Sequence, residues 1–353
     1  MKRPPRGAPR PAAVAVEIIA DVTAMGGQGD GVCRTADGET VFAPFVLPGE
    51  KARLSVSGGR GDIVELLEKS PERVEPPCPH FEACGGCALQ HWAPAPYLEW
   101  KADTIRVALS REGLEAEFLP PFAAPPGARR RVALHARADG RGGAKLGYKA
   151  RRSWSLVEIT VCPVTDPRLV AAFPALRRLA APFLEHPKSA PTLHATLTST
   201  GIDVDITGVE RKSGGLSADS RRRAAEIAAG ADIARVSLAG EVVYQARSPM
   251  VRLGHVAAVL PPGGFLQAVA AAESAMAEAA LGAFKGASRL ADLFCGLGAF
   301  TFRLAEIAPV LAADMDARAI GALKTAVGSG PGLKAITAEA RDLFRRPGAH
   351  SGL

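Results

Sequence analysis

The stretch that decides the fold of the C-terminal region is Leu290-Ala-Asp-Leu-Phe-Cys-Gly-Leu-Gly-Ala-Phe300. It predicts a strand that ends in a Gly-x-Gly turn and opens a helix running through Leu304. Glycines at that point let a nucleotide-like ligand approach the backbone at the carboxyl end of the strand, beside a helix N-terminus. We therefore expect a Rossmann-like α/β domain with a ligand site at this turn.

A second apolar run, Val310 to Asp314, ends in an acid 22 positions after Asp292. This is the usual place for a carboxylate that accepts hydrogen bonds from both hydroxyls of a ribose. A lone Gly-x-Gly is a weak signal. This turn also lacks the third glycine with which a dinucleotide-binding turn approaches a phosphate. Together with Asp314, the pattern favours S-adenosylmethionine over a dinucleotide.

The sequence pattern upstream of this stretch is different. From about Val14 to Val74, short apolar runs alternate with turn signals such as Pro48-Gly49, which is typical of a small β-barrel. Strands and helices mix up to about Pro262, and an Ala-rich helix, Ala268 to Phe284, then precedes the α/β pattern. We expect four regions: a flexible basic tail over 1–12, the barrel over 13–74, a cysteine loop and central domain over 75–262, and the α/β domain over 263–353.

Composition and charge narrow the classes of protein further. With 353 residues, 22% of them charged and 47% hydrophobic, the chain is too long for one ordinary domain and too apolar to be disordered. No segment reads as a membrane span or a secretion signal, so we expect a cytoplasmic protein. The net charge of +7 makes polyanions plausible partners, although Lys2, Arg3, Arg6 and Arg10 of the tail carry much of it.

Four of the six cysteines form a candidate metal site. Cys78, Cys84 and Cys87 stand in the run Cys78-x5-Cys84-Gly-Gly-Cys87, which puts three thiolates on one loop. Cys162, which follows an apolar strand and precedes Pro163, is the best-placed fourth ligand. Thiolate ligation suits zinc or an iron–sulfur cluster, and the spacing does not choose between them. A disulfide and inert buried thiols are the alternatives.

Taken together, these motifs resemble the RNA (uracil-5-)methyltransferase family, and within it the bacterial enzymes that carry a TRAM domain and an iron–sulfur cluster and methylate a uridine in 23S rRNA. The resemblance runs nearly end to end, and Cys84-Gly-Gly-Cys-Ala-Leu-Gln-His91 is its most diagnostic motif. The other motifs that carry it are Gly29-Asp-Gly31, Phe42 to Glu50, Ser70 to Val74, Gly263 to Gln267, Asp292 to Gly296 and Arg341 to Phe344.

The resemblance implies an OB-like TRAM β-barrel, an α+β central domain with the cluster loop, and a Rossmann-like methyltransferase domain. Residues implied to bind S-adenosylmethionine are Gln267, Phe294, Asp314 and Asp342, with Gly296 and Gly298 shaping the turn. Asp314 stands where the family more often has Glu, and Ala299 where it often has Asn. Cys78, Cys84, Cys87 and Cys162 would hold a [4Fe–4S] cluster, and Cys295 would be a packing residue. The partner would be RNA, with 23S rRNA favoured over other RNAs. The protein would be a monomer and would not associate with membranes.

The resemblance also implies what this chain lacks. The family activates C5 of uracil by adding a cysteine thiolate to C6, and a base then removes the C5 proton. In the family those residues follow the Asp342 region, and this chain ends at Leu353. We therefore expect an incomplete methyltransferase domain with no catalytic residue in this chain, and the strand at Leu290 as an exposed apolar edge.

Two other functions stay open on the sequence. A non-catalytic RNA-binding protein would use the barrel, the cysteine loop and the central domain to hold RNA without turnover. In either case Trp92, Trp100 and Trp154, which lie near basic residues, could stack on unpaired bases or pack inside the fold. The second function that stays open is that of a zinc protein, in which the cysteines bind zinc instead of an iron–sulfur cluster.

Overall fold

The computed structural model describes residues 15–210, 216–328 and 332–344. It divides into two compact units, Met1–Pro121 and Phe122–Leu353, which we treat separately. The basic tail expected over 1–12 lies outside the described residues. The expected boundary at Pro262 falls inside the second unit, because the strands before it and the helices after it pack into one body.

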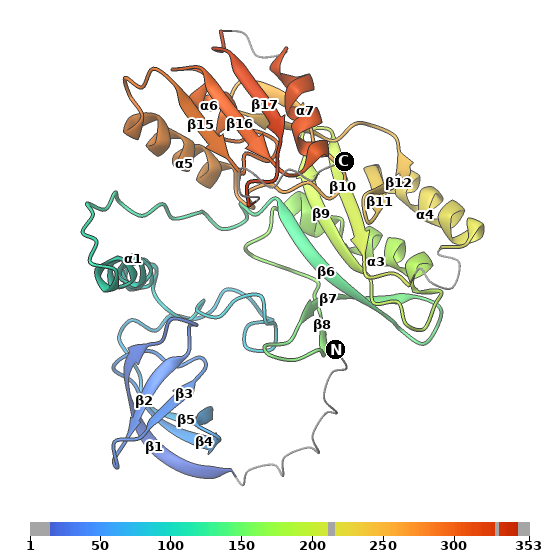
Figure 1. Cartoon of the computed structure of the whole chain (residues 1–353). Coiled ribbons are helices and arrows are strands. Elements are labelled where there is room, and N and C mark those ends of the chain that lie inside the picture. The colour runs from blue at the N-terminus through green and yellow to red at the C-terminus, as the bar shows by residue number, and fades with distance from the viewer. Residues whose placement is uncertain (1–14, 211–215, 329–331, 345–353) are drawn as a thin grey trace, which may run out of the picture. The chain divides into compact units, whose positions relative to one another are not determined.

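The first unit begins with a closed five-stranded barrel, as predicted (Figure 1, blue). Its strands are β1 (Val16–Met25), β2 (Gly31–Thr35), β3 (Thr40–Ala43), β4 (Lys51–Ser57) and β5 (Arg60–Glu68), in the order β1-β2-β3-β5-β4. Alternate residues point inward, so that Val22, Cys33, Val41 and Leu54 share one core. Arg73 ties the following segment to the barrel, with its Nε 2.6 Å from Glu50 Oε1.

The cysteine loop follows the barrel, and helix α1 (Pro94–Arg111) follows the loop. The sequence predicts a helix from Tyr97 to Leu114. The helix begins earlier because a proline is well suited to the first turn, where its missing N–H is not needed. It ends before Gly113, whose φ of 68° stops the helical path.

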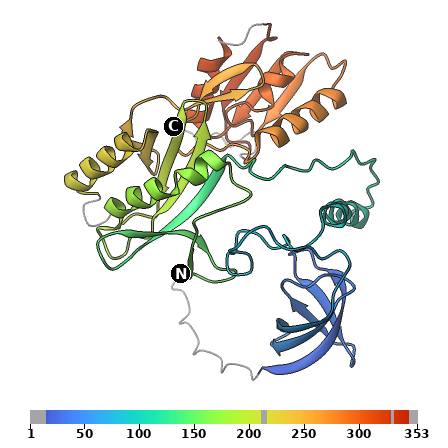
Figure 2. The same ribbon diagram turned by 180° about the vertical axis from the view of Figure 1, so that it is seen from behind.

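The second unit is built on a seven-stranded sheet of order β12-β11-β10-β9-β6-β7-β8. The strands are β6 (Arg131–Ala138), β7 (Ala144–Lys149), β8 (Leu156–Glu158), β9 (Thr192–Thr198), β10 (Gly201–Thr207), β11 (Ile233–Leu238) and β12 (Glu241–Gln245). The helices are α2 (Pro167–Ala171), α3 (Phe173–Ala180), the 3-10 turn η1 (Ala181–Leu184) and α4 (Ala218–Gly230). Helices α3 and α4 lie across one face of the sheet (Figure 2), where Leu134 and Leu146 pack with Leu176 and Ala224.

One helix predicted in this region is broken into three segments in the structure. The sequence predicts a single helix from Pro167 to Leu184, whereas the structure has α2, α3 and η1. Each of these segments has a proline at its first or second position. Proline lacks the N–H that would continue the preceding helix, so each proline starts a new segment.

The last part of the second unit is the predicted α/β pattern. A hairpin of β13 (Met250–Leu253) and β14 (Val256–Val259) leads to α5 (Ala270–Ala283), and a small sheet follows. Its elements are β15 (Leu290–Leu293), α6 (Thr301–Leu304), β16 (Val310–Asp314), α7 (Ala317–Val327) and β17 (Ile336–Ala340). The three strands are parallel in the order β15-β16-β17. Among the described strands, β15 pairs with β16 alone.

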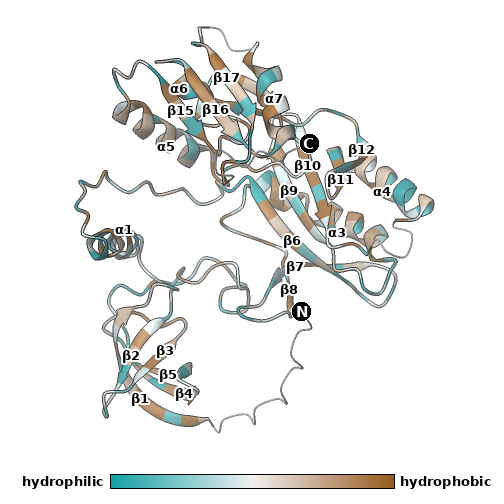
Figure 3. Cartoon of the chain, viewed as in Figure 1, coloured by the Kyte–Doolittle hydropathy of each residue, from teal (hydrophilic) through white to brown (hydrophobic). Residues whose placement is uncertain are grey.

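Apolar residues recur along the strands of both units (Figure 3). In the small sheet they form a core between the β13–β14 hairpin, α7 and β16, in which Leu253, Phe302, Ala312 and Leu323 are buried. No helix in the described part of the chain is both long and apolar enough to cross a membrane.

Candidate functional site

The glycine turn forms where the sequence predicts it, directly after β15. Phe294 adopts a φ of 61° and Gly296 a φ of 53°, which turns the chain sharply at the strand's carboxyl end. The backbone N–H of Cys295 donates to Ala313 O at 3.2 Å, and that of Gly298 donates to Cys295 O at 2.9 Å. These bonds hold the turn against β16 and lead it into α6.

Gly298 is needed for two independent reasons. Its φ is 96°, which L side chains rarely adopt. A Cβ at this position would stand 2.9 Å from Leu323 Cδ1 and 3.0 Å from Phe302 Cε2. The turn therefore packs directly on α7 and α6.

Asp314 ends β16 with its carboxylate facing the glycine turn. Its Oδ2 accepts a hydrogen bond from the Gly296 N–H at 2.8 Å, and its Oδ1 accepts one from the Asp316 N–H at 2.8 Å. A carboxylate can accept about four hydrogen bonds, so each oxygen keeps capacity for a further donor. Two backbone N–H groups thus fix the carboxylate beside the turn.

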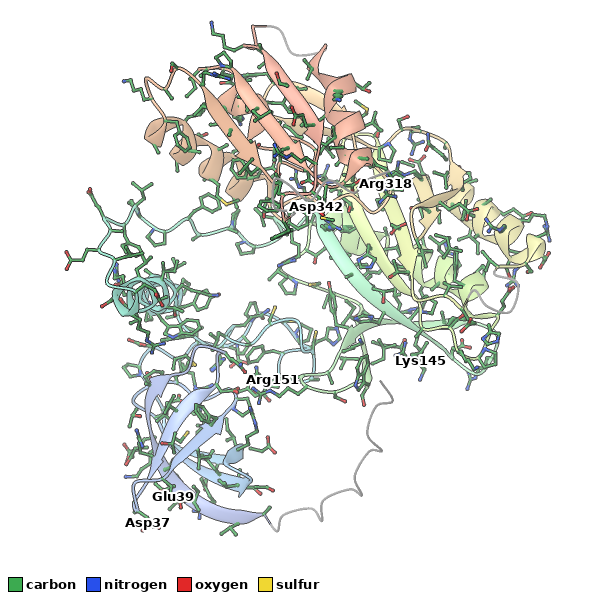
Figure 4. All side chains as sticks on the ribbon, in the orientation of Figure 1. Asp37, Glu39, Lys145, Arg151, Arg318 and Asp342 are labelled. Carbon is green, nitrogen blue, oxygen red and sulfur yellow. The ribbon has the colours of Figure 1, made fainter. Side chains whose placement is uncertain are left out.

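Phe294 and Asp342 lie at the same end of the sheet. Asp314 pairs with Ala340 at the end of β17, so Asp342 follows two residues later at the same edge (Figure 4). The Phe294 ring stands 5.5 Å from the Phe344 ring, centroid to centroid, and Asp342 Oδ1 accepts from the Phe344 N–H at 3.0 Å. The side chains of Phe294, Asp342 and Phe344 are exposed. Phe294 and Asp342, two of the predicted ligand residues, therefore border an open surface.

Phe344 is a site residue that the sequence interpretation did not name. Its ring is 79% exposed and faces Phe294, which gives the open surface two aromatic walls. The only sequence signal is its place after the third strand, in the motif Arg341-Asp-Leu-Phe344.

Next to the turn lies a polar pair, the buried Thr301 and the half-buried Asp292. Thr301 Oγ1 donates to Asp292 Oδ2 at 2.6 Å, which anchors the start of α6 to β15. Burial raises the pKa of the Asp292 carboxyl. Burial, with the nearby charges of Asp292 and Asp314, also raises the pKa of Cys295 to about 12. Because the thiolate is the nucleophilic form of cysteine, these surroundings suit packing and not catalysis.

Gln267 is placed through its backbone. Its carbonyl oxygen accepts from Arg130 Nε at 3.1 Å, while Arg130 Nη2 pairs with the buried Glu273 Oε2 at 2.8 Å. No hydrogen bond joins the Gln267 side chain to the glycine turn among the described residues. The ion pair borders a cavity of about 430 Å³, whose lining includes Ala299 and Arg303 but none of the predicted ligand residues.

The expected cysteine ligands are divided between the two units. Cys78, Cys84 and Cys87 are half-buried in the first unit, and Cys162 is half-buried in the second. The Gly86 N–H points to Cys84 Sγ at 3.4 Å, and Thr165 Oγ1 donates to Cys162 Sγ at 3.2 Å. Within the described ranges, no three His, Cys, Asp or Glu side chains form a group that could hold a metal ion. The metal site stays a prediction.

Comparison with known proteins places the chain in a family. An uncharacterized RNA methyltransferase of Caulobacter vibrioides is 66% identical over 327 residues, which cover 92% of this chain and 79% of that protein. The chain belongs to the RNA methyltransferase family. A second uncharacterized RNA methyltransferase, from Brucella suis, is 41% identical over 92% of the chain and 77% of its own length. No protein-family model matches the chain.

Two proteins similar to this RNA methyltransferase carry names that give a substrate. The 23S rRNA (uracil(1939)-C(5))-methyltransferase RlmD of Halomonas elongata is 34% identical over 78% of the chain and 61% of its own length. A solved tRNA (uracil-54, C5)-methyltransferase from Pyrococcus abyssi, in complex with S-adenosyl-L-homocysteine, superposes with a TM-score of 0.61. That likeness covers 89% of this chain and 80% of the other at 22% identity, and it confirms the methyltransferase fold.

Proposed function

We propose that this RNA methyltransferase transfers the methyl group of S-adenosylmethionine to C5 of a uridine in RNA, with 23S rRNA as the substrate. The observation that carries the proposal is the Asp314 carboxylate, held at the glycine turn with acceptor capacity to spare. The naming of the Halomonas relative supports the choice of uridine and of 23S rRNA.

The residues divide the work of binding the cofactor. Asp314 would accept the two ribose hydroxyls, and the flat ring of Phe294 would cover the ligand from one side. Asp342, at the end of β17, would accept from the polar part of the ligand, while Gly296 and Gly298 keep the turn low. We also place Gln267 at this site, with Arg130 holding its backbone. When bound, S-adenosylmethionine supplies an electrophilic methyl group.

The acceptor carbon needs activation that the described residues do not supply. C5 of uracil becomes nucleophilic when a thiolate adds to C6, and a base must later remove the C5 proton. Cys295 is unsuited to this role because it is buried and its pKa is raised to about 12. We therefore assign no catalytic residue to the part of the chain that the structure describes.

The function is tested by the RNA of cells with and without the gene. Nucleosides from purified 23S rRNA and from transfer RNA are compared by mass spectrometry in the wild type, the deletion strain and the complemented strain. We expect 5-methyluridine to be lost from 23S rRNA in the deletion strain and restored by the gene. Loss from transfer RNA instead would contradict the substrate, and no change in either RNA would contradict the reaction.

We further propose that Cys78, Cys84, Cys87 and Cys162 hold a [4Fe–4S] cluster. The loop spacing and the donors aimed at Cys84 and Cys162 support it, since such donors stabilise thiolate sulfur. Anaerobically purified protein is analysed for iron, labile sulfide and zinc, with Cys33→Ser as the control variant. Iron with sulfide that is lost in Cys84→Ser and Cys162→Ser supports the cluster. Zinc without sulfide, or neither metal, contradicts it.

A further inference from the structure

The seven-stranded sheet of the second unit has one covered face and one polar face. Val132, Leu134 and Ala136 of β6 point into the core under α3 and α4. Because side chains alternate along a strand, Arg131, His135 and Arg137 point to the opposite side, which we call the outer face.

The outer face carries positive charge over β6 and β7. Arg137 pairs in register with Lys145, which is labelled in Figure 4. His135 pairs with Gly147, and Lys149 lies two positions beyond Gly147 on the same face. The described strands β6, β7 and β9 place no carboxylate on this face. Lys145 has no ion-pair partner among the described residues.

Glu158 of β8 pairs in register with Gly147 and so brings one carboxylate to this face, where its Oε1 lies 3.8 Å from Arg177 Nη2. The acids on the other side of β6 lie further along the sheet. Asp203 and Asp205 of β10 are 3% and 6% exposed. Asp203 is paired with Arg235 at 2.8 Å, and Asp205 accepts from Ser237 Oγ at 2.7 Å. On the outer face of the described strands β6, β7 and β8, the cations Arg131, Arg137, Lys145 and Lys149 therefore outnumber the one carboxylate.

Trp154 stands at the end of this charged face, in the loop that joins β7 to β8. Its side chain is 78% exposed, and Lys149 Nζ lies 4.0 Å from the ring centroid. The loop is held by backbone hydrogen bonds, from Ala150 N to Ser155 O at 2.8 Å and from Ser153 N to Ala150 O at 3.1 Å. A large aromatic ring is thus fixed in solvent beside a cation instead of packing inside.

The other two tryptophans do not offer such a surface. Trp92 is buried and donates from Nε1 to Glu72 Oε2 at 2.8 Å, and Trp100 donates from Nε1 to Met25 O at 3.3 Å. Of the three candidates for base stacking, the structure leaves Trp154 as the one whose ring is free of such bonds.

The outer face also reaches the loop that carries Gln267, at Arg131. The Arg131 guanidinium lies over the Phe265 ring at 5.5 Å, and that ring is 72% exposed. Exposed aromatics therefore stand beside two cations of a charged strip formed by β6 and β7, Phe265 beside Arg131 and Trp154 beside Lys149. Planar rings separated by cations are suited to unpaired bases joined by phosphates.

We propose that this strip binds a single-stranded segment of RNA, with one unpaired base stacked on Trp154 and phosphates contacting Lys145 and Lys149. The inference rests on the proposed RNA substrate and adds the site that would hold the strand away from the reacting uridine. A single strand is favoured over a duplex because paired bases cannot present their flat faces to a side chain.

The test measures binding of a fluorescent single-stranded RNA by polarisation. We expect Trp154→Ala to weaken binding about 5- to 100-fold, since stacking on one aromatic contributes that much. Trp154→Phe should keep most of the affinity. Phe284→Ala, which removes another exposed aromatic of the same unit at the end of α5, should bind as the wild type does.

Salt dependence tests the cations separately. Each phosphate contact on a single strand contributes about −0.7 to the slope of log K against log salt, so Lys145→Gln with Lys149→Gln should flatten the slope by about 1.4. Arg222→Gln is the matched loss of charge on α4, where Arg222 pairs with Asp219 and Glu226. It should leave the slope unchanged.

The outcomes separate this inference from the proposed function. If the wild type binds RNA and Trp154→Ala binds equally well, the stacking site is wrong while the methyltransferase function stands. If duplex RNA competes as well as single-stranded RNA, the proposed strip is also wrong. If the wild type binds no RNA and 5-methyluridine persists in the deletion strain, the proposed function itself fails.

Discussion

Single buried residues decide how pH acts on the first unit. His91 is fully buried, with its ring 5.3 Å from that of Phe81. Burial, and then the positive charge of Arg73, lowers its pKa from 6.5 to about 4. The folded protein therefore keeps this imidazole neutral at pH values where the unfolded chain would protonate it.

We predict that His91 makes the first unit less stable as the pH falls. Between pH 6.5 and 4 the unfolded state binds a proton that the folded state does not, so stability present above 6.5 is lost on acidification. The expected loss from pH 7 to pH 5 is roughly 2 kcal/mol. Denaturant unfolding at the two pH values, compared between wild type and His91→Phe, measures it. An equal loss in both proteins would contradict the prediction.

At the scale of elements, tight packing of the glycine turn on α6 and α7 positions the carboxylate of Asp314. We predict that Gly298→Ala destabilises the second unit by about 2–4 kcal/mol, because a methyl group would clash and the φ is unfavourable. Gly321→Ala is the control, since it lies inside α7 with nothing within 4 Å of the added Cβ. It should be neutral or stabilising by up to about 1 kcal/mol. Thermal unfolding of both variants decides, and equal stabilities would contradict the account.

Elements with a periodic pattern or turn signals could be predicted from the sequence. The barrel, α5 and the β15-turn-β16 unit could be predicted from turn signals, an Ala-rich run and glycine spacing. Strand β11 could not be, because all six of its residues are buried and show no alternation. The break between α2 and α3 did have a local signal, the proline at the second position of α3, which the prediction of one continuous helix did not use.

At the scale of the whole molecule, the sequence indicates the chemistry more readily than the packing. Segments on the two sides of the expected boundary at Pro262 contact each other: Arg130 pairs with Glu273 of α5, and Arg129 forms a bridge to Val269. Such contacts join residues far apart in sequence and leave no local pattern. Asp314 could be predicted beside the glycine turn from strand order alone. The outer face could not be predicted, because the register of the sheet decides which residues share it.

The most direct test of the account is the affinity of the 353-residue protein for S-adenosylmethionine, measured by calorimetry. Asp314→Asn should bind at least about ten-fold more weakly, because a charge-assisted hydrogen bond contributes about 1.5–3 kcal/mol. Asp316→Asn is the control: Asp316 caps α7, and asparagine caps a helix equally well. Wild-type affinity in Asp316→Asn with loss in Asp314→Asn is the predicted result. Wild-type affinity in a folded Asp314→Asn protein would contradict the claim that this carboxylate holds the ribose.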